Sequence, residues 1–299
     1  MTNPFSGPMK PAPQLAPYGR PISLNHPRAL VHVFESGPQD KPAVILIHGL
    51  QDEADTWRHI FEPIAQTHRV VALDLPGFGR SDKAKRAYSV PFYADVVLAT
   101  MDALRIGYAT LIGSSMGAMI AETIALTRPS RVLRLVLVDG TIRLVKTNPS
   151  PMSTPLGLLT APGRDKRYFE KLRQSPGEAF DSLLPFYGNM NALSKDDRDF
   201  LYQRVNERVW DEPQRRVSLA LQMGFPLFFM GRAPGLITRI SALAVPTHII
   251  WGEHDHIFPL INGRERASVQ PNATFTEVKD TGHLPHQEKP DEFLGALKI

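Results

Sequence analysis

The sequence predicts an α/β protein with a mostly parallel eight-stranded sheet, helices on both faces and a helical insertion. Two patterns indicate this class: short apolar runs alternate with helical patterns, as in parallel sheets, and the alternation fails in one long interval. The composition agrees, because 299 residues, of which 42% are apolar and 21% charged, suit one large domain or a core with an insert. These proportions argue against a disordered or fibrous protein.

Eight short segments carry the strand pattern. The clearest is the run from Val44 to Ile47, which is apolar without alternation and therefore suits a strand covered on both faces. A strand pair is expected to precede that run. In order, the expected strands are residues 22–24, 30–34, 43–48, 70–75, 110–113, 132–138, 247–251 and 273–278.

Helical patterns separate these runs. One set of apolar residues recurs at helical spacing, namely Tyr93, Val96, Val97, Met101 and Leu104. The segment 116–126 is apolar nearly all round, as in a buried helix. The segment 290–297 reads as a final helix with proline in its first turn.

The alternation of strands and helices is interrupted by a long insertion. This interval is rich in Pro and Met and contains amphipathic pieces at 192–210 and 215–223, after which the strand pattern returns beyond Pro246. We therefore expect a sheet that is split in sequence by a helical cap. The predicted division is a Pro-rich N-terminal arm at 1–21, a core at 22–140 and 235–299, and the cap at 141–234.

Charge and cysteine content exclude several kinds of site. The formal charge of +4 and the isoelectric point near 9.3 come from scattered basic residues, which alternate with Asp165 and Glu170 in the segment 164–173. This pattern is typical of a solvated face with mixed charge, so we expect no nucleic-acid partner. The absence of cysteine excludes disulfides, zinc-thiolate sites and a thiol nucleophile.

No segment combines the length and apolarity of a membrane span. The longest apolar-looking stretch, residues 217–231, contains Gln222 and Pro226 and falls short of the roughly 20 residues that cross a bilayer. The first residues are Pro-rich and lack a basic start followed by an apolar run, unlike a secretory signal. We therefore expect a cytoplasmic protein.

The sharpest chemical signal is the pentapeptide Gly113-Ser114-Ser115-Met116-Gly117, which follows an expected strand and precedes an expected helix. This is the context of a nucleophile elbow, in which small residues on both sides let the backbone turn tightly and expose the central hydroxyl. The pentapeptide alone could also be a glycine-softened helix start. The strand before it favours Ser115 as a nucleophile.

A serine nucleophile needs a base, and the position of His283 selects it among ten histidines. His283 follows Gly282 in the expected loop between the last strand and the last helix, from which its ring can reach the sheet edge. His286 is the alternative base, and a buried imidazole that only makes hydrogen bonds is the alternative role for His283.

The third group must be a carboxylate that accepts a hydrogen bond from the imidazole. Asp255 follows the expected strand 247–251 and lies between Ser115 and His283 in sequence. Glu253 and Asp139, which ends the expected strand 132–138, are the alternatives. The cluster around Asp255 could suggest a metal, but no third well-placed ligand accompanies it, so we expect no metal site.

With these residues in place, the sequence resembles the α/β-hydrolase superfamily, in its capped, serine-nucleophile branch. The resemblance covers nearly the whole chain outside the arm. It is carried by the elbow and by His48-Gly49, Asp74-Leu75-Pro76-Gly77-Phe78-Gly79-Arg80-Ser81, Gly252-Glu253-His254-Asp255 and Gly282-His283, with Glu288 and Pro290 beyond. The resemblance implies the α/β-hydrolase fold, with the cap inserted after the sixth strand.

The same resemblance implies an oxyanion hole. Hydrolases of this kind use backbone N–H groups from the residue after the nucleophile and from the loop after the third strand. These donors correspond to Met116 and Leu50. His48, just before that loop, is interpreted as a packing residue and not as a second base.

The expected activity is hydrolysis of small to medium apolar or aromatic carboxylic esters through an acyl-enzyme, with no cofactor. Dehalogenases and epoxide hydrolases of the fold carry aspartate at the nucleophile position, which Ser115 argues against. Carbon–carbon bond hydrolases usually have asparagine before the serine and tryptophan after the histidine, where Ser114 and Leu284 stand here. That reaction stays an alternative, together with lactonase, amidase and perhydrolase activity and, in another class, a non-catalytic ligand receptor.

An apolar tunnel above Ser115 is expected to hold the acyl group, because ligand pockets commonly form between domains and are mostly apolar. The sequence does not indicate an oligomeric state. The apolar cap residues from which the tunnel wall is expected are Leu156, Leu158, Leu159, Phe186, Tyr187, Trp210, Met223, Phe225, Leu227, Phe228, Phe229 and Met230.

Overall fold

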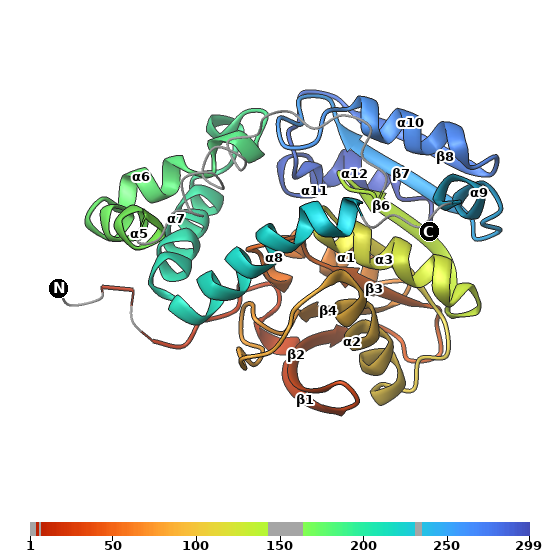
Figure 1. Ribbon diagram of the computed structural model, residues 1–299, viewed down its shortest axis with the longest axis horizontal. Helices are drawn as coiled ribbons and strands as arrows, with labels where there is room; N and C mark the ends of the chain where they lie inside the picture. Colours follow the sequence, from red (N-terminus) through yellow and green to blue (C-terminus); the bar gives the residue numbers. More distant parts are fainter. Residues whose placement is uncertain (1–3, 6, 143–163, 231–234) are drawn as a thin grey trace.

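A computed structural model describes residues 4–5, 7–142, 164–230 and 235–299, without the side chains of 164–165 and 225–230. Its centre is an eight-stranded sheet (Figure 1). The strands are β1 (Gly19–Asn25), β2 (Arg28–Ser36), β3 (Ala43–Ile47), β4 (Arg69–Asp74), β5 (Ala109–Ser114), β6 (Val132–Val138), β7 (Thr247–Gly252) and β8 (Ala273–Val278). All eight predicted strands are therefore present.

The strand order β1-β2-β4-β3-β5-β6-β7-β8 makes the sheet mostly parallel. β2 pairs antiparallel with β1 and β4, whereas all the pairings among β3 to β8 are parallel. The order reverses at β3, which lies between β4 and β5. In open α/β sheets, ligands bind outside the carboxyl ends of the strands at such a reversal. The loops after β3 and β5 meet at this edge.

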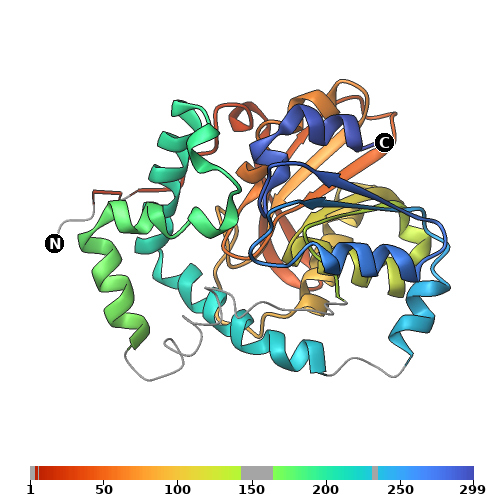
Figure 2. The same ribbon diagram turned by 90° about the horizontal axis from the view of Figure 1, so that it is seen from above.

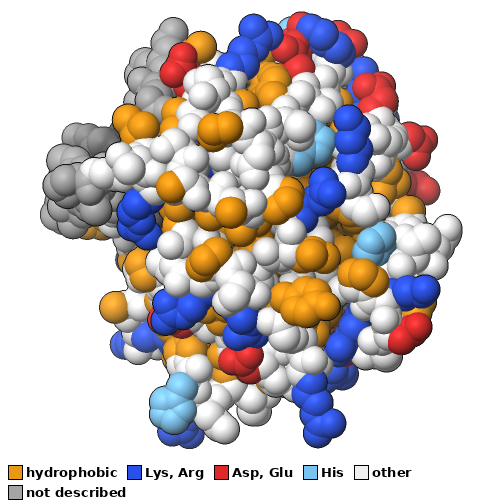
Figure 3. Space-filling view, turned by 90° about the vertical axis from the view of Figure 1, so that its right-hand side faces the viewer, with side chains coloured by type: hydrophobic (Ala, Val, Ile, Leu, Met, Phe, Trp, Pro, Cys, Tyr) orange, Lys and Arg blue, Asp and Glu red, His pale blue; other side chains and the backbone are white. Residues whose placement is uncertain are grey.

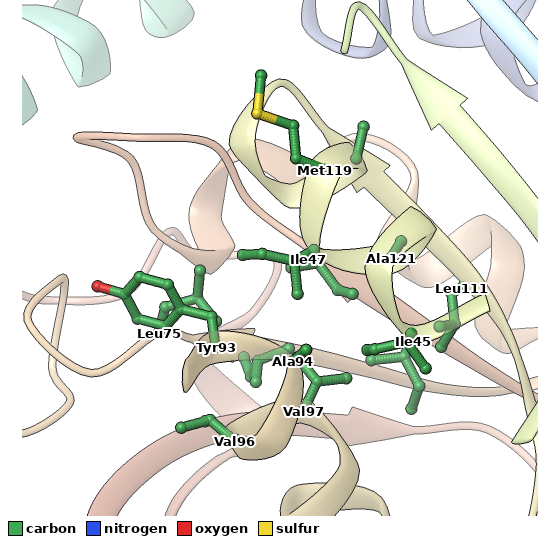
Figure 4. Packing of buried hydrophobic residues seen from close by; sticks show 14 of the residues in the cluster. Ile45, Ile47, Leu75, Tyr93, Ala94, Val96, Val97, Leu111, Met119 and Ala121 are labelled. Atoms are coloured by element: carbon green, nitrogen blue, oxygen red, sulfur yellow. The ribbon is translucent and has the colours of Figure 1, made fainter. Parts of the chain in front are cut away.

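Alternate residues of the central strands face two separate cores. Ile45 and Ile47 of β3 pack with α2 (Val90–Ala103) and α3 (Met116–Thr127), as Figure 4 shows. Val44 and Leu46 belong to the opposite core, with α1 (Phe61–Ala65) and α12 (Pro290–Ala296). Because both faces of β3 are covered, its sequence has no polar alternation.

The insertion between β6 and β7 is helical in the residues described. It contains α5 (Arg164–Gln174), α6 (Pro176–Asp181), α7 (Lys195–Trp210), α8 (Glu212–Met230) and α9 (Leu236–Ser241), with the short 3-10 helices η4 (Leu184–Phe186) and η5 (Met190–Ala192). Figures 1 and 2 show α5, α6 and α7 grouped beside the core, while α8 runs back along it. The cap boundaries at 141 and 234 stay a prediction, and residues 143–163 and 231–234 lie outside the described part.

One predicted helix is longer than its sequence pattern indicated. The amphipathic pattern at 215–223 becomes α8, which continues through Gly224 and Pro226 to Met230. A proline removes one helical hydrogen bond and strains the preceding turn, which is why local reasoning ended the helix before it. That local penalty does not end α8.

The remaining elements complete the core around the sheet. They are η1 (Ala16–Tyr18), η2 (Ala54–Trp57), η3 (Pro129–Arg131), α10 (Ile261–Val269) and α11 (Pro285–Glu288). The N-terminal segment joins this core: Ala12 and Leu15 are fully buried, and the N–H of Ala12 donates to Asp55 Oδ1 at 2.8 Å. β1 also begins at Gly19, inside the segment expected to be an extended arm.

Two features of the structure concern binding to nucleic acids and to membranes. Figure 3 shows one face of the molecule, over which Lys and Arg side chains are spread among apolar and uncharged ones. Among the described helices, none is long and apolar enough to cross a membrane.

Candidate active site

Ser115 lies at the sharp turn between β5 and α3. Its backbone has φ 55° and ψ −117°, a conformation that non-glycine residues rarely adopt, and its N–H donates to the carbonyl of Val138 at 2.8 Å. A Cβ at Gly113 would lie 2.2 Å from the carbonyl oxygen of Gly117, and one at Gly117 would lie 2.0 Å from that of Ile47. Both glycines are therefore required for this turn, which leaves the Ser115 side chain partly exposed at the sheet edge.

His283 and Asp255 are joined by a buried hydrogen bond. The Nδ1 of His283 lies 2.9 Å from Asp255 Oδ2, and the other carboxylate oxygen of Asp255 accepts from the N–H groups of Ile257 and Phe258 at 2.8 and 2.9 Å. Because an ionised carboxylate only accepts, the proton of this bond belongs to Nδ1, and a neutral imidazole then has a free lone pair on Nε2. That atom is suited to accept a proton from a hydroxyl.

The ends of β5, β6 and β7 bring Ser115 and the His283–Asp255 pair to one edge of the sheet. The end of β6 and the residues after it pack against Ser115: the carbonyl of Val138 accepts from its N–H, and a Cβ at Gly140 would lie 2.3 Å from its carbonyl oxygen. In the described chain, Ser115 and His283 share no hydrogen bond. Such contacts are commonly long without substrate and tighten in the reacting complex.

The other histidines considered for this site have different partners. The Nε2 of His286 lies 3.0 Å from Thr56 Oγ1, its ring lies 4.4 Å from that of Trp57, and burial holds its pKa well below the usual value. His48 accepts from the N–H of Leu75 at Nε2, so its Nδ1 donates to the carbonyl of Gly49 at 2.7 Å. Burial also lowers the pKa of His48. Both rings are neutral and tied to structural partners.

The alternative carboxylates also differ from Asp255. Glu253 accepts from Lys279 Nζ and from the N–H of Asp280, each at 3.1 Å. Asp139 is buried beside the pair, and its ligand atom lies within 4.8 Å of those of Asp255 and His283. These three atoms could in principle ligate a metal, but Nδ1 already donates to Asp255, and a metal would have to displace that bond.

The expected oxyanion donors flank Ser115. Met116 is the first residue of α3, and N–H groups in the first turn of a helix have no acceptor within it. Leu50 follows β3 and Gly49, and a Cβ at Gly49 would lie 3.1 Å from Ser115 Cβ and 3.7 Å from its Oγ. The loop after β3 therefore passes directly against the serine.

Sequence reasoning missed that the cap supports the His283 loop. The N–H of His283 donates to the carbonyl of Phe186 at 2.8 Å, and Glu288 accepts from the N–H groups of Gly282 and Gly188 at 2.7 and 2.9 Å. Phe186 and Gly188 belong to the insertion. Glu288 was visible in the motif after His283, but its partner in the cap lies 100 residues away and has no local signal.

A cavity of about 480 Å³ lies between α5, α8 and the loop after Leu50, and none of its lining residues belongs to the predicted tunnel wall. Its lining residues are Gln51, Lys166, Phe169, Arg173, Glu212, Arg215, Arg216, Leu219 and Gln222. Most of these residues are polar or charged. Of the predicted wall, Leu156, Leu158 and Leu159 lie outside the described residues, as do the side chains of 225–230.

The sheet order, the strained serine turn and the buried imidazole–carboxylate pair together define a protein of the α/β-hydrolase class. A family model described as the alpha/beta hydrolase fold matches residues 42–290, and the chain belongs to this family.

Individual relatives of this chain are hydrolases of several kinds. The pyrrolizixenacetamide deacetylase of Xenorhabdus hominickii is 27% identical over 266 residues, covering 86% of this chain and 90% of that protein. A thermophilic esterase from Thermogutta terrifontis superposes with a TM-score of 0.71 at 22% identity, covering 94% and 96% of the two chains. The 2-hydroxy-6-oxo-6-phenylhexa-2,4-dienoate hydrolase of Rhodococcus sp. strain RHA1 gives 0.75 at 19% identity, covering 93% and 98%. At these identities the two structures support the shared fold.

Proposed function

We propose that the protein is a serine hydrolase that cleaves small to medium apolar or aromatic carboxylic esters. The observation that carries this proposal is the buried hydrogen bond between His283 and Asp255, at the same sheet edge as the strained Ser115 turn. The arrangement supplies a nucleophile, a base and a carboxylate that orients the base. The esterase among the structural relatives supports the ester as substrate class.

The reaction proceeds in two halves. His283 Nε2 takes the proton of the Ser115 hydroxyl as its oxygen attacks the ester carbonyl, and the N–H groups of Leu50 and Met116 receive the developing oxyanion. Collapse of this intermediate breaks the bond to the alcohol, which leaves with the proton from His283. Water, activated by the same imidazole, then releases the acid and restores the serine. Asp255 stays ionised and stabilises the imidazolium in both halves.

Three kinds of alternative use the same residues or the same fold. A carbon–carbon hydrolase has support from the dienoate hydrolase among the relatives, but Ser114 and Leu284 depart from the residues usual in that group. Lactonase, amidase and perhydrolase activities can use the same triad, and the deacetylase relative supports the amidase. A ligand receptor with this fold would bind an ester without turning it over.

The test is turnover of chromogenic esters graded by acyl length, with neutral, aromatic and carboxylate-bearing acyl groups. We expect hydrolysis, and Ser115→Ala is expected to lower kcat by roughly a million-fold, as removal of a triad nucleophile can. The neighbouring Ser114→Ala is the matched control, because the Ser114 hydroxyl is buried and has no hydrogen-bond partner among the described residues. It is expected to keep kcat within about threefold, since it removes no hydrogen bond.

Three results would contradict the proposal. Binding without turnover across the panel would favour the receptor. A dienone acid cleaved faster than every ester would favour carbon–carbon hydrolysis. Equal loss of activity in the Ser114 and Ser115 variants would remove the assignment of the nucleophile.

A further inference from the structure

Asp139 holds a buried carboxyl group for which the mechanism above has no use. It follows β6, has φ 47°, and its N–H donates to the carbonyl of Ile250 at 3.1 Å. Its Oδ1 accepts from the N–H of Gly252 at 2.8 Å. Its Oδ2 is buried and receives no hydrogen bond from any described donor. This second oxygen is therefore available for a contact of another kind.

The neighbour of Asp139 is the carboxylate that orients the imidazole. Ligand atoms of Asp139, Asp255 and His283 all lie within 4.8 Å of one another, and all three side chains are buried. Two ionised carboxylates so close in a buried site repel each other strongly, so one of them keeps a proton. The question is which one.

Hydrogen bonding decides where the proton resides. Asp255 accepts from the Nδ1–H of His283 and from two backbone N–H groups, all of which stabilise its ionised form. Asp139 accepts from the single N–H of Gly252. The proton is therefore held by Asp139, and its O–H can donate to the adjacent carboxylate.

The charged surroundings agree with this assignment. Burial and the nearby carboxylate of Asp255 raise the pKa of Asp139 well above its usual value. Glu288 of α11 is a further carboxyl that acts in the same direction. The titratable groups that face Asp139 are thus Asp255, His283 and Glu288, from the elements after β7 and β8.

We propose that Asp139 is a positioning residue of this site, whose neutral carboxyl group donates a hydrogen bond to Asp255 and holds that carboxylate against His283. The inference of a role in turnover rests on the proposed serine hydrolase function. The proton stays on Asp139 throughout, so no bond at Asp139 forms or breaks in the reaction. The group adds a fourth donor to Asp255 without adding a charge beside the imidazolium.

The protonation state can be read without any activity. In the infrared difference spectrum of the wild type minus Asp139→Asn at neutral pH, we expect the carbonyl band of a neutral carboxylic acid. A difference that contains only ionised carboxylate bands would overturn the proposal. The downfield proton resonance of the His283–Asp255 hydrogen bond should be kept in Asp139→Asn and shifted in Asp139→Ala. An unchanged resonance in both variants would show that Asp139 does not position the pair.

Kinetics then separate a neutral donor from a second acid. An asparagine amide can donate to Asp255 and accept from Gly252, so Asp139→Asn should keep kcat/KM within about tenfold of the wild-type value. Asp139→Ala should lower kcat/KM by roughly 10- to 100-fold, the typical effect of a lost hydrogen bond to a charged group. Without that donor Asp255 attracts the imidazolium more strongly, so the acid limb of the kcat/KM profile should move to higher pH in the alanine variant alone.

An ionised Asp139 would give the opposite pattern. Asp139→Asn would then remove a negative charge beside His283 and move the acid limb to lower pH. The control is Asp280→Asn, because that carboxylate is 77% exposed and lies 3.5 Å from Lys289. If alanine prevents folding, the asparagine variant and its spectrum still decide. If no ester is hydrolysed at all, the proposed function fails, and the infrared and proton measurements test Asp139 separately.

Discussion

The sheet that carries the candidate site and the junction between that sheet and the cap are held together by different forces. The sheet is apolar: Ile45, Leu111 and Val136 of its central strands are fully buried among aliphatic neighbours. The junction is ionic. We call it the ionic seam, and its members are Asp52, Glu53, Asp55 and Arg58 of the core with Asp197, Arg204 and Arg208 of α7.

The ionic seam is well paired and mostly buried. Arg204 lies 3.1 Å from Glu53 and 3.0 Å from Asp55, and Arg208 lies 2.8 Å from Glu53 and 2.7 Å from Asp52. The side chains of Glu53 and Asp55 are at most 1% exposed. Charges removed from water in this way are costly unless paired, so the position of α7 is fixed by the need to pair them.

This difference suggests that the sheet and the ionic seam have separate roles in the protein. Apolar packing of the sheet places the strand ends that Ser115 and Asp255 follow, and this packing does not depend on pH. The ionic seam begins at Asp52, two residues after Leu50, so the cap is attached to the same loop that carries a proposed oxyanion donor. Variants of the sheet edge should therefore change turnover, whereas variants of the seam should change the stability of the cap.

The largest effect is expected at the sheet edge. Asp255→Asn should lower kcat by about 10⁴-fold, because the amide cannot stabilise the imidazolium and favours the wrong tautomer of His283. The free energy of unfolding should change much less than the barrier. Steady-state kinetics and urea unfolding measure the two quantities.

Glu253→Gln is the matched control for this prediction. Glu253 is the other acidic residue of the motif, and it pairs with Lys279 at the surface. Its replacement should leave kcat within about twofold, since exposed ion pairs contribute little. Comparable losses in both variants would contradict the role of the His283–Asp255 bond.

The next largest effect is expected in the ionic seam. Arg204→Gln should lower the free energy of unfolding by about 3 kcal/mol, the lower end of the cost of breaking a buried ion pair. The lower end applies because Arg80 still pairs with Asp55 and Arg208 still pairs with Glu53. Urea unfolding followed by Trp fluorescence measures the loss.

Arg216→Gln provides the comparison on the cap surface. The side chains of Arg216 and its partner Glu212 are 52% and 64% exposed, so its loss should cost at most about 0.5 kcal/mol. An equally small cost for Arg204 would mean that the seam is not what fixes the cap.

The sequence allowed prediction of those features that depend on residues close together in the chain. The eight strands, the Ser115 turn between two glycines and the order Ser115, Asp255, His283 all follow from runs, spacing and motif context. The ionic seam did not follow, because Arg204 and Glu53 are far apart in the chain and each alone looks like an ordinary surface charge. The position of Asp139 next to Asp255 did not follow either. The sequence showed Asp139 as a carboxylate at the end of a strand, but only the pairing of β6 with β7 places it beside Asp255.

The smallest predicted effect concerns the pH dependence of the seam. Burial alone would raise the pKa of Asp197, but hydrogen bonds and charge from His59 and Arg58 hold it well below its usual range. Because this pKa is lower in the folded protein than in the unfolded chain, Asp197 stabilises the fold at neutral pH. That contribution is lost progressively as the pH falls below about 4, toward the lowered folded-state value.

Asp197→Asn should therefore cost about 1.5 kcal/mol at pH 7, the lower end of the range for hydrogen bonds to a charged group, and its deficit should shrink as the pH falls below about 4. Urea unfolding of both proteins between neutral and acid pH measures this difference. Asp199→Asn, on the same helix, is the control, because that carboxylate is 63% exposed and pairs with Lys195 at the surface. A deficit for Asp197→Asn that stays constant with pH would show that its ionisation does not stabilise the junction, and that the seam is held by shape and neutral hydrogen bonds instead.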